Sequence, residues 1–237
     1  MKPLLIALDF DGTLTRIRKR PQDAVLSPSM RRLLKKIKKK YPLAIWSGRG
    51  LTQLKKKINI RGLFYAGNHG LEIAGPGFTF THPAARRNRK LINQLFTKLS
   101  AKLKKIPSII ENKRYSISVH YRITPAHQLA ALKKIFYNIT GPLARRRQIA
   151  VKGGKKVLEV LPPLKWHKGH ALKLLQQHLG NIPVLYLGDD LTDEDVFRSL
   201  SKKDRGIFVG RPRSKTFAKE HLTGIPAVRK LLKSLVK

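Results

Sequence analysis

This chain of 237 residues contains no cysteine, and it contains only 13 acidic residues against 51 Lys and Arg. Without cysteine there is no disulfide, no zinc–thiolate site and no thiol nucleophile, and we expect a reducing compartment, the cytoplasm. No apolar run approaches the roughly 20 residues that span a bilayer. The first apolar run stops at Asp9, which is too short for a signal peptide. We therefore expect no membrane partner.

The shortage of acids leaves a net charge of +38. Such a charge predicts salt-sensitive attraction to phosphates, nucleic acid or anionic membranes. Most basic residues fall on the polar faces of expected amphipathic helices, and no basic patch is interleaved with aromatic residues. We interpret the charge mainly as a solvated surface and expect no specific nucleic-acid partner. A basic nucleic-acid-associated protein stays as the alternative from another functional class.

The few acids are not scattered as surface solubilisers would be. Ten of the 13 fall in short segments at expected strand ends and turns. These ten are Asp9, Asp11, Glu72, Glu111, Glu159, Asp189, Asp190, Asp193, Glu194 and Asp195. The clustering indicates that most of them have a chemical role, although Glu194 and Asp195 also suit the first turn of a helix, where the helix dipole favours acids.

The pair Asp9 and Asp11 is the most informative feature. The apolar strand expected at 4–8 ends in these two acids, and Gly12 then lets the backbone turn away. Open α/β sheets place their ligands at the carboxyl ends of buried strands. Burying two acids side by side is costly unless a cation or a proton compensates them. The pair therefore indicates a reactive or metal-binding site.

The pattern of elements changes twice along the chain. Strands alternate with helices at the start and again near the end, which is typical of a doubly wound parallel sheet. Between them, helix–strand–strand occurs twice, and Gly153-Gly154 gives a hairpin signal for the second strand pair. The predicted fold class is α/β, with a core formed by residues 1–85 and 163–237 and an inserted α+β domain at 86–162.

Several ordered motifs resemble one known superfamily, the haloacid dehalogenase (HAD) phosphotransferases. They are Asp9-x-Asp11-Gly-Thr13, Ser47, Lys168 and Gly188-Asp189-Asp190-x-x-Asp193, and the insertion looks like the larger α+β cap type. Within that superfamily the chain resembles the trehalose-6-phosphate phosphatase family. The runs that carry this second resemblance are Ser47-Gly48-Arg49, Ala66–Ile73, Glu111-Asn-Lys113, Ser118–Arg122, Gly154–Val160, Trp166–Gly169, Tyr186–Asp195 and Val209–Arg211.

Hydrolysis of a phosphate monoester needs a nucleophile, a proton donor and positive charge around the phosphoryl oxygens. The resemblance implies that Asp9 is the nucleophile and that Asp11 is the general acid and base. It implies that Ser47 bonds a phosphoryl oxygen, and that Lys168 neutralises the nucleophile and the phosphate.

The expected cofactor is Mg²⁺, which prefers oxygen ligands. Its ligands would be the carboxylates of Asp9 and Asp189 and the backbone carbonyl of Asp11. Asp190 and Asp193 would orient those ligands and Lys168.

The expected substrate is trehalose 6-phosphate, which would give trehalose and inorganic phosphate. The candidate substrate-binding residues in the core are Thr13, Arg49, Asn68 and His69, and those in the inserted domain are Glu111, Lys113 and Glu159. A structural histidine at His69 and a salt-bridge network in the inserted domain are the alternatives. Sucrose-, mannosylglycerate- and glucosylglycerate-phosphate phosphatases are the alternative functions. We expect a monomer, and a trehalose-phosphate synthase is the protein partner that the resemblance suggests.

Two positions depart from the family pattern. Leu161 stands where an Arg usually follows Leu-Glu-Val, and His167 stands where Asn or Asp commonly precedes Lys-Gly. Neither departure touches the acids or the lysine of the expected chemistry.

Overall fold

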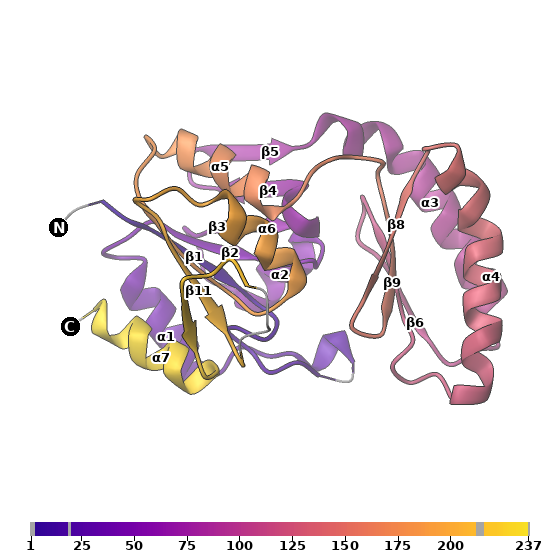
Figure 1. The fold of residues 1–237 in the computed structure, drawn as a ribbon, viewed down its shortest axis with the longest axis horizontal. Helices are drawn as coiled ribbons and strands as arrows, with labels where there is room; N and C mark the ends of the chain where they lie inside the picture. Colours follow the sequence, from indigo (N-terminus) through magenta and orange to yellow (C-terminus); the bar gives the residue numbers. More distant parts are fainter. Residues whose placement is uncertain (1–2, 19, 212–215, 237) are drawn as a thin grey trace. The chain divides into compact units, whose positions relative to one another are not determined.

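The computed structural model describes residues 3–18, 20–211 and 216–236. Contacts divide the chain into two compact units (Figure 1). The first consists of Met1–Phe80 and Trp166–Lys237, and the second consists of Thr81–Lys165. The parallel sheet belongs to the first unit, and the inserted α+β segment forms the second.

The first unit is built on an eight-stranded sheet of order β12-β11-β10-β1-β2-β3-β4-β5. Its strands are β1 (Leu5–Asp9), β2 (Leu43–Trp46), β3 (Phe64–Gly67), β4 (Glu72–Gly75), β5 (Phe78–Thr81), β10 (Val184–Gly188), β11 (Arg205–Val209) and β12 (Glu220–Leu222). β1 lies between β2 and β10 and is parallel to both. All five of its residues are buried, which agrees with the unbroken apolar run at 5–8 that precedes Asp9.

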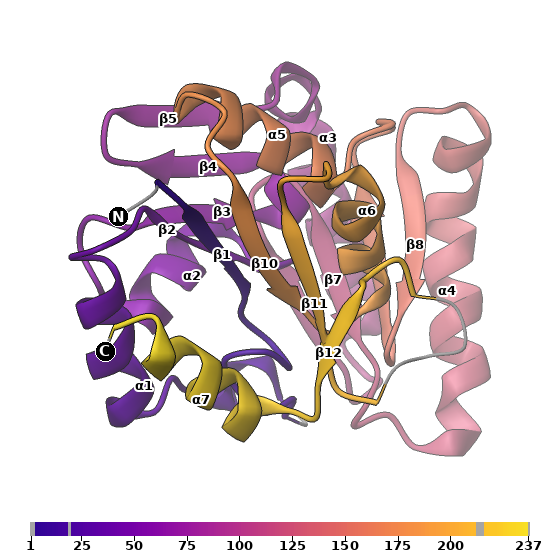
Figure 2. The ribbon, with the colours of Figure 1, turned by 60° about the vertical axis from the view of Figure 1, so that its left-hand side comes forward.

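Helices cover both faces of this sheet, as a doubly wound fold requires. One face carries α1 (Pro28–Ile37), α2 (Leu51–Ile58) and α7 (Ile225–Ser234), and the other carries α5 (Lys168–His178) and α6 (Leu191–Ser199). Figure 2 shows the two sets on opposite sides of the strands. The connections place the loop after each parallel strand at one edge of the sheet.

The start of α1 follows from its sequence. Ser27 caps the helix, because its hydroxyl accepts a bond of 3.2 Å from the Met30 N–H, and Pro28 occupies the first turn. The apolar side chains of the helix recur at three- and four-residue spacing and are buried against the sheet. These are the sequence signals that predict a helix start.

Three strands of this sheet were absent from the sequence prediction. They are β4, β5 and β12. β4 runs antiparallel to β3 and extends the sheet beyond its parallel part. The alternation of Phe and Thr in β5 and the Gly-Pro-Gly segment before it are an available hairpin signal, whereas β12 has only three residues and too little pattern to be recognised.

The second unit packs two helices on one face of a four-stranded antiparallel sheet of order β6-β7-β9-β8 (Figure 1). Its elements are α3 (Pro83–Leu103), β6 (Ile109–Asn112), β7 (Ile117–His120), α4 (Ala126–Arg145), β8 (Ala150–Gly154) and β9 (Val157–Leu161). Strand residues that point to the helices, such as Val119 and Val160, are fully buried in an apolar core.

The predicted hairpin turn at Gly153-Gly154 is wrong by two residues. Both glycines lie in β8, and Gly154 pairs with Val157. The turn is at Lys155-Lys156, where Lys156 adopts a left-handed backbone with φ of 63°. Gly154 suits the strand because a Cβ there would lie 2.8 Å from Val157 Cγ1. Among the described residues of both units, no helix is long and apolar enough to cross a bilayer.

Candidate active site

The site lies where β1, β2 and β10 end, at the carboxyl edge of the first unit's sheet. Leu8 is level with Leu187 of β10, and Asp9 is level with Trp46 of β2. This register places Asp9 beside the segment Gly188-Asp189 on one side and Ser47 on the other. The parallel strand order thus collects residues that are far apart in the sequence.

Gly12 allows the loop after β1 to pass directly over Asp189. Its φ is +100°, and a Cβ at this position would lie 2.2 Å from Asp189 Oδ2. Only a residue without a side chain fits both the backbone and the space. The glycine of the Asp-x-Asp-Gly run therefore serves the site by letting the loop and the Asp189 carboxylate approach each other.

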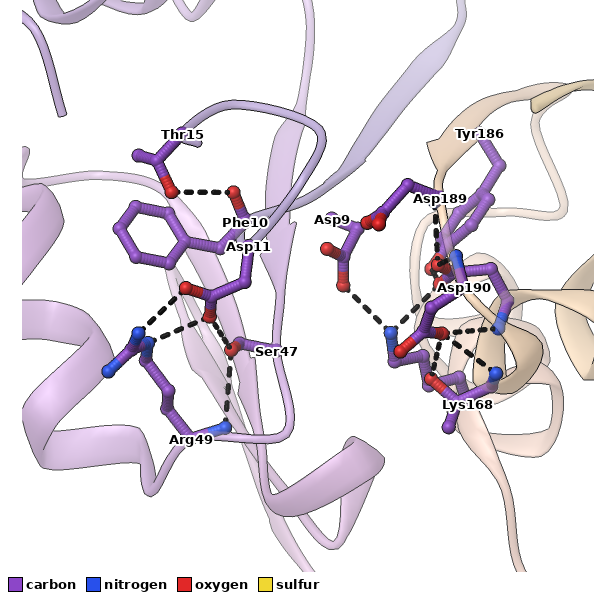
Figure 3. Close-up of polar contacts among 12 residues, drawn as sticks. Asp9, Phe10, Asp11, Thr15, Ser47, Arg49, Lys168, Tyr186, Asp189 and Asp190 are labelled. Carbon is purple, nitrogen blue, oxygen red and sulfur yellow. Dashed lines mark hydrogen bonds and ion pairs between the residues drawn. The ribbon is translucent and has the colours of Figure 1, made fainter. Parts of the chain in front are cut away.

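The carboxylates of Asp9 and Asp11 are held by different basic side chains. Figure 3 shows Asp11 directed toward Arg49 and Ser47, while Asp9 is directed toward Lys168. The Arg49 guanidinium donates two bonds to Asp11, from Nε at 2.8 Å and from Nη2 at 2.7 Å. Ser47 Oγ lies 3.3 Å from Asp11 Oδ2 and accepts a bond from the Arg49 N–H at 3.2 Å. Each acid of the pair is thus held by its own positively charged partner.

Lys168 joins two acids from different segments. Its Nζ donates to Asp9 Oδ1 at 2.7 Å and to Asp193 Oδ1 at 2.8 Å, and the lysine is almost fully buried. Lys168 is the first residue of α5, and His167 caps that helix by accepting the Gly169 N–H on Nδ1 at 3.1 Å. The ring nitrogen of His167 can therefore cap the helix in place of the Asn or Asp that is common in the family.

Asp193 is the most heavily bonded acid of the site. Besides Lys168, it accepts the Tyr186 hydroxyl at 2.6 Å and the backbone N–H groups of Asp189 and Asp190 at 2.9 and 3.0 Å. Asp190 caps α6 through bonds to the Thr192 N–H and hydroxyl at 2.8 and 2.7 Å. Asp193 therefore fixes the backbone that carries Asp189 and the position of Lys168.

Burial and charge shift the proton affinities of this cluster strongly. Burial raises the pKa of Asp9 well above its usual value, despite the opposing effect of Lys168. Burial also raises the pKa of Asp193. Burial alone would lower the pKa of Lys168, but Asp193 and Asp9 outweigh it and raise that pKa well above its usual value, so this ammonium stays charged.

Asp190 behaves in the opposite way to its buried neighbours. Burial favours its neutral form, but Lys168, the bonds from Thr192 and the nearby His69 outweigh that effect and lower its pKa. The result is a buried region that combines several acids with the Lys168 ammonium. Additional positive charge would be stabilised there.

A divalent cation fits this region. Carboxylate oxygens of Asp9, Asp189 and Asp193 lie within 4.8 Å of one another, and all three residues are buried. Oxygen-only donors are the preferred ligands of Mg²⁺. Because Asp193 already accepts four bonds, Asp9 and Asp189 are better placed to supply ligands, and Asp193 to orient them.

The segment after β3 is tied to the segment after β2. The Asn68 N–H donates to the Arg49 carbonyl at 2.7 Å, and the His69 N–H donates to the Ser47 carbonyl at 3.2 Å. Asn68 and His69 both have positive φ, in a short 3-10 helix at Asn68–Gly70. The Asn68 side chain bonds buried Glu72, while the His69 ring lies against Gly48 and close enough to Asp190 to lower its pKa.

Thr13 is fully buried in the loop after β1. Within the described part of the chain, its hydroxyl has no hydrogen-bond partner. An unsatisfied buried hydroxyl is costly. This orphan group marks the loop as a place where a ligand oxygen would be stabilising.

The three acidic and basic candidates of the second unit lie on the sheet face that does not pack on α3 and α4. Lys113 Nζ bonds Glu159 Oε1 at 2.9 Å, and the Ser118 hydroxyl donates to the same oxygen at 2.7 Å. Glu111 Oε2 lies 2.8 Å from His120 Nε2. Glu111, Ser118 and Glu159 stand in one register row across three strands.

We predicted no role from the sequence for three residues of these clusters. Tyr186 was detectable as the one hydroxyl-bearing residue of an otherwise aliphatic strand, two residues before Gly188-Asp189. Ser118 and His120 were detectable as polar residues that alternate with Ile117 and Val119 in β7. All three bond directly to acids of the sites described above.

The chain has a HAD-like α/β fold. A haloacid dehalogenase-like hydrolase from Bacteroides thetaiotaomicron shares the fold with a TM-score of 0.69 at 18% identity, covering 99% of this chain and 100% of that chain. Residues 7–224 match the family model described as trehalose-phosphatase. The chain belongs to the trehalose-phosphatase family.

Individual relatives agree with this assignment. Trehalose-phosphate phosphatase B of Arabidopsis thaliana is 31% identical over an alignment of 253 positions, which covers 100% of this chain and 67% of that protein. A solved structure described as a trehalose-6-phosphate phosphatase related protein has a TM-score of 0.86 at 23% identity, and the match covers 98% of this chain and 96% of that chain. At this identity the structural likeness supports the fold alone.

Proposed function

We propose that this protein hydrolyses trehalose 6-phosphate to trehalose and inorganic phosphate, in trehalose biosynthesis, through an aspartyl-phosphate on Asp9. The observation that supports the proposal best is the placement of Asp9 at the end of β1, bonded to Lys168 and grouped with Asp189 and Asp193. Membership of the trehalose-phosphatase family supports the substrate.

In the first step a carboxylate oxygen of Asp9 attacks phosphorus, and the bond from phosphorus to the sugar oxygen breaks. Asp11 gives a proton to that departing oxygen. Lys168 stabilises the negative charge of the nucleophile and the phosphoryl group, and the Ser47 hydroxyl donates to a phosphoryl oxygen. In this structure the Ser47 hydroxyl donates to Asp11. Ser47 therefore exchanges its bond to Asp11 for a bond to the phosphate when the substrate enters.

In the second step water attacks the aspartyl-phosphate, and Asp11 accepts its proton. The bond between phosphorus and Asp9 breaks, which releases inorganic phosphate and restores the carboxylate. In this structure Asp11 is paired with Arg49. The substrate must draw Asp11 away from Arg49 before the first step.

Magnesium is the proposed cofactor, with Asp9, Asp189 and the Asp11 carbonyl as ligands. It would supply positive charge to the phosphoryl oxygens. Asp193 and Asp190 hold the Asp189 backbone and the start of α6, and so orient this ligand. The alternative, a site that works through Lys168 alone, predicts phosphatase activity without added metal.

The residues Glu111, Lys113 and Glu159 are proposed to bind hydroxyl groups of the sugar. Carboxylates and ammonium groups bind hydroxyls well. A substrate that lacks the matching hydroxyl leaves such a buried group unpaired and therefore binds poorly. The ion pair between Lys113 and Glu159 equally suits a purely structural network. Glu111→Ala separates the two: loss of disaccharide turnover with normal turnover of p-nitrophenyl phosphate supports sugar binding.

The deciding experiment measures phosphate release from trehalose 6-phosphate, sucrose 6-phosphate and glucose 6-phosphate, with Mg²⁺ and with EDTA, for the natural sequence and for Asp9→Asn. We expect a strong preference for trehalose 6-phosphate that needs Mg²⁺ and is lost in the variant. Preference for another sugar phosphate would keep the mechanism and overturn the substrate. Full activity of folded Asp9→Asn would overturn the mechanism.

A further inference from the structure

The two faces of the first unit's sheet differ sharply in charge. Segments 28–40, 51–61 and 225–236, which contain α1, α2 and α7, hold fourteen Lys and Arg and no Asp or Glu. On the opposite face, α5 and α6 hold three basic and three acidic residues. The basic character is therefore concentrated on one side of this unit, which we name the α1 face.

The α1 face is one continuous layer. α1 and α7 are in contact, and Arg31 of α1 donates to the carbonyl groups of Ile58 and Lys57 at the end of α2. Lys38 donates to the Arg61 carbonyl at 2.7 Å, and Lys57 donates to the carbonyls of Gln22 and Ala24. These three basic residues are used to hold the layer together.

Most of the other basic residues of these segments are exposed. The exposed ones are Arg32, Lys35, Lys36, Lys39, Lys40, Lys55, Lys56, Arg61, Lys230 and Lys233. Arg32, Lys35 and Lys36 of α1 and Lys39 of the turn after it form a stripe at spacings of three and four residues, where like charges repel one another. No acid within these segments offsets that repulsion. The arrangement of the stripe disfavours the helix unless a polyanion binds to it.

We propose that the α1 face binds double-stranded nucleic acid through the phosphate backbone, without sequence preference. The stripe spans about 10 Å of helix axis, whereas a duplex offers one phosphate charge per roughly 1.7 Å. α1, α2 and α7 contain no aromatic residue on which single-stranded bases could stack. A duplex therefore fits the face better than a single strand does.

A lipid surface fits the face less well than a duplex. Interfacial helices insert large apolar side chains between lipids. Among the described residues, the exposed large apolar side chains are Ile17, Val25, Ile123, Tyr137, Leu191 and Phe217, and none of them belongs to α1, α2 or α7. The α1 face thus offers charge without apolar anchors. This proposal does not rest on the phosphatase function, because it uses no residue of the active site.

The test compares two fourfold variants of equal charge change. One carries Arg32, Lys35, Lys36 and Lys39 changed to Gln on the α1 face, and the matched control carries Lys98, Lys102, Lys104 and Lys105 changed to Gln in the second unit, where all four are exposed. Binding of a fluorescein-labelled 20-base-pair DNA duplex is followed by anisotropy between 50 and 300 mM NaCl. Circular dichroism and phosphatase activity verify that both variants are folded.

We expect the α1 variant to weaken binding at least about tenfold at 100 mM salt, and to lower the slope of log K against log salt by about 2–4. The control should change the slope by less than about 1. Equal losses of affinity in the two variants would mean that binding depends on net charge alone, which would overturn the proposal. Failure of the natural protein to bind the duplex would also overturn it. Loss of binding to phosphatidylserine vesicles without loss of duplex binding would assign the face to membranes instead.

Discussion

The Arg49 guanidinium holds Asp11 by two parallel bonds of 2.7 and 2.8 Å. Such forked pairs are strong and fix the direction of a carboxylate. Asp9, two residues earlier, is instead bonded to Lys168. This division keeps the proposed nucleophile and the proposed proton carrier in separate electrostatic surroundings, although both come from a single short loop.

Arg49→Lys should lower kcat for trehalose 6-phosphate by about 10- to 100-fold, because one ammonium cannot replace two charged hydrogen bonds with fixed geometry. Steady-state kinetics measure the effect. Gln53→Ala is the matched control, since Gln53 contacts the Nη1 of Arg49 at 3.3 Å, and it should change kcat by less than about threefold. A fully active Arg49→Lys enzyme would show that the fork is not needed.

Asp193→Asn should be more damaging to stability than Tyr186→Phe. The first change removes the negatively charged partner of buried Lys168 and should lower the free energy of unfolding by about 3 kcal/mol. The second removes one hydroxyl bond to the acid and should cost about 1–2 kcal/mol. Urea denaturation at pH 7 gives both values. The reverse order would mean that Asp193 is not the central acceptor that its four donors indicate.

Gly12→Ala and Gly77→Ala separate backbone strain from crowding. Both glycines have positive φ, but a Cβ meets Asp189 at Gly12 and nothing within 4 Å at Gly77. Gly77→Ala should cost about 1 kcal/mol of stability, and Gly12→Ala should cost more and also abolish stabilisation by millimolar Mg²⁺. Thermal melts with and without Mg²⁺ report both effects. Equal behaviour of the two variants would argue against a role for the close approach.

Ser118→Ala should raise KM for trehalose 6-phosphate by about 5- to 10-fold, which corresponds to the loss of one hydrogen bond to the Glu159 carboxylate. Turnover of p-nitrophenyl phosphate should stay unchanged. Ser108→Ala, which removes a hydroxyl bonded only to the Ile106 carbonyl, should leave KM unaltered. An equal loss of activity toward both substrates would indicate general damage to the fold.

The pair formed by Arg205 and Glu220 predicts a small dependence of stability on pH. The hydrogen bonds from Arg205 lower the pKa of Glu220. A lowered acid pKa stabilises the folded state above the unfolded pKa of about 4.3, and that stabilisation is lost as the pH falls through the folded pKa. Glu220→Gln should therefore lower Tm at pH 7 and have no effect near pH 2. The pair is largely exposed, so the effect should be at most about 1 kcal/mol and weaker in salt.

Much of the first unit could be predicted because its signals are local. The order of strands and helices implied the parallel sheet, and that sheet brings Asp9 and Asp189 together. The partners of the acids were less predictable. Arg49, which we expected to bind substrate, bonds to Asp11, and this pairing depends on side-chain directions that spacing does not encode.

The hairpin of the second unit shows the opposite kind of failure. The glycines suggested the turn, but the register of β8 and β9 placed them in the strand and put Lys156 in the left-handed conformation. Pairing of whole strands outweighed the local preference of one residue. Contacts such as that between Ser118 and Glu159 depend on the same register, so they could not be predicted from the sequence either.

On the α1 face, Arg31, Lys38 and Lys57 donate to backbone carbonyl oxygens. Carbonyl groups do not titrate in the range in which carboxylates take up protons. These bonds therefore do not depend on carboxylates, of which this chain has few. Moderate acid should unfold this layer later than it disturbs the carboxylate cluster of the active site, which confers acid tolerance on the scaffold but not on its catalytic centre.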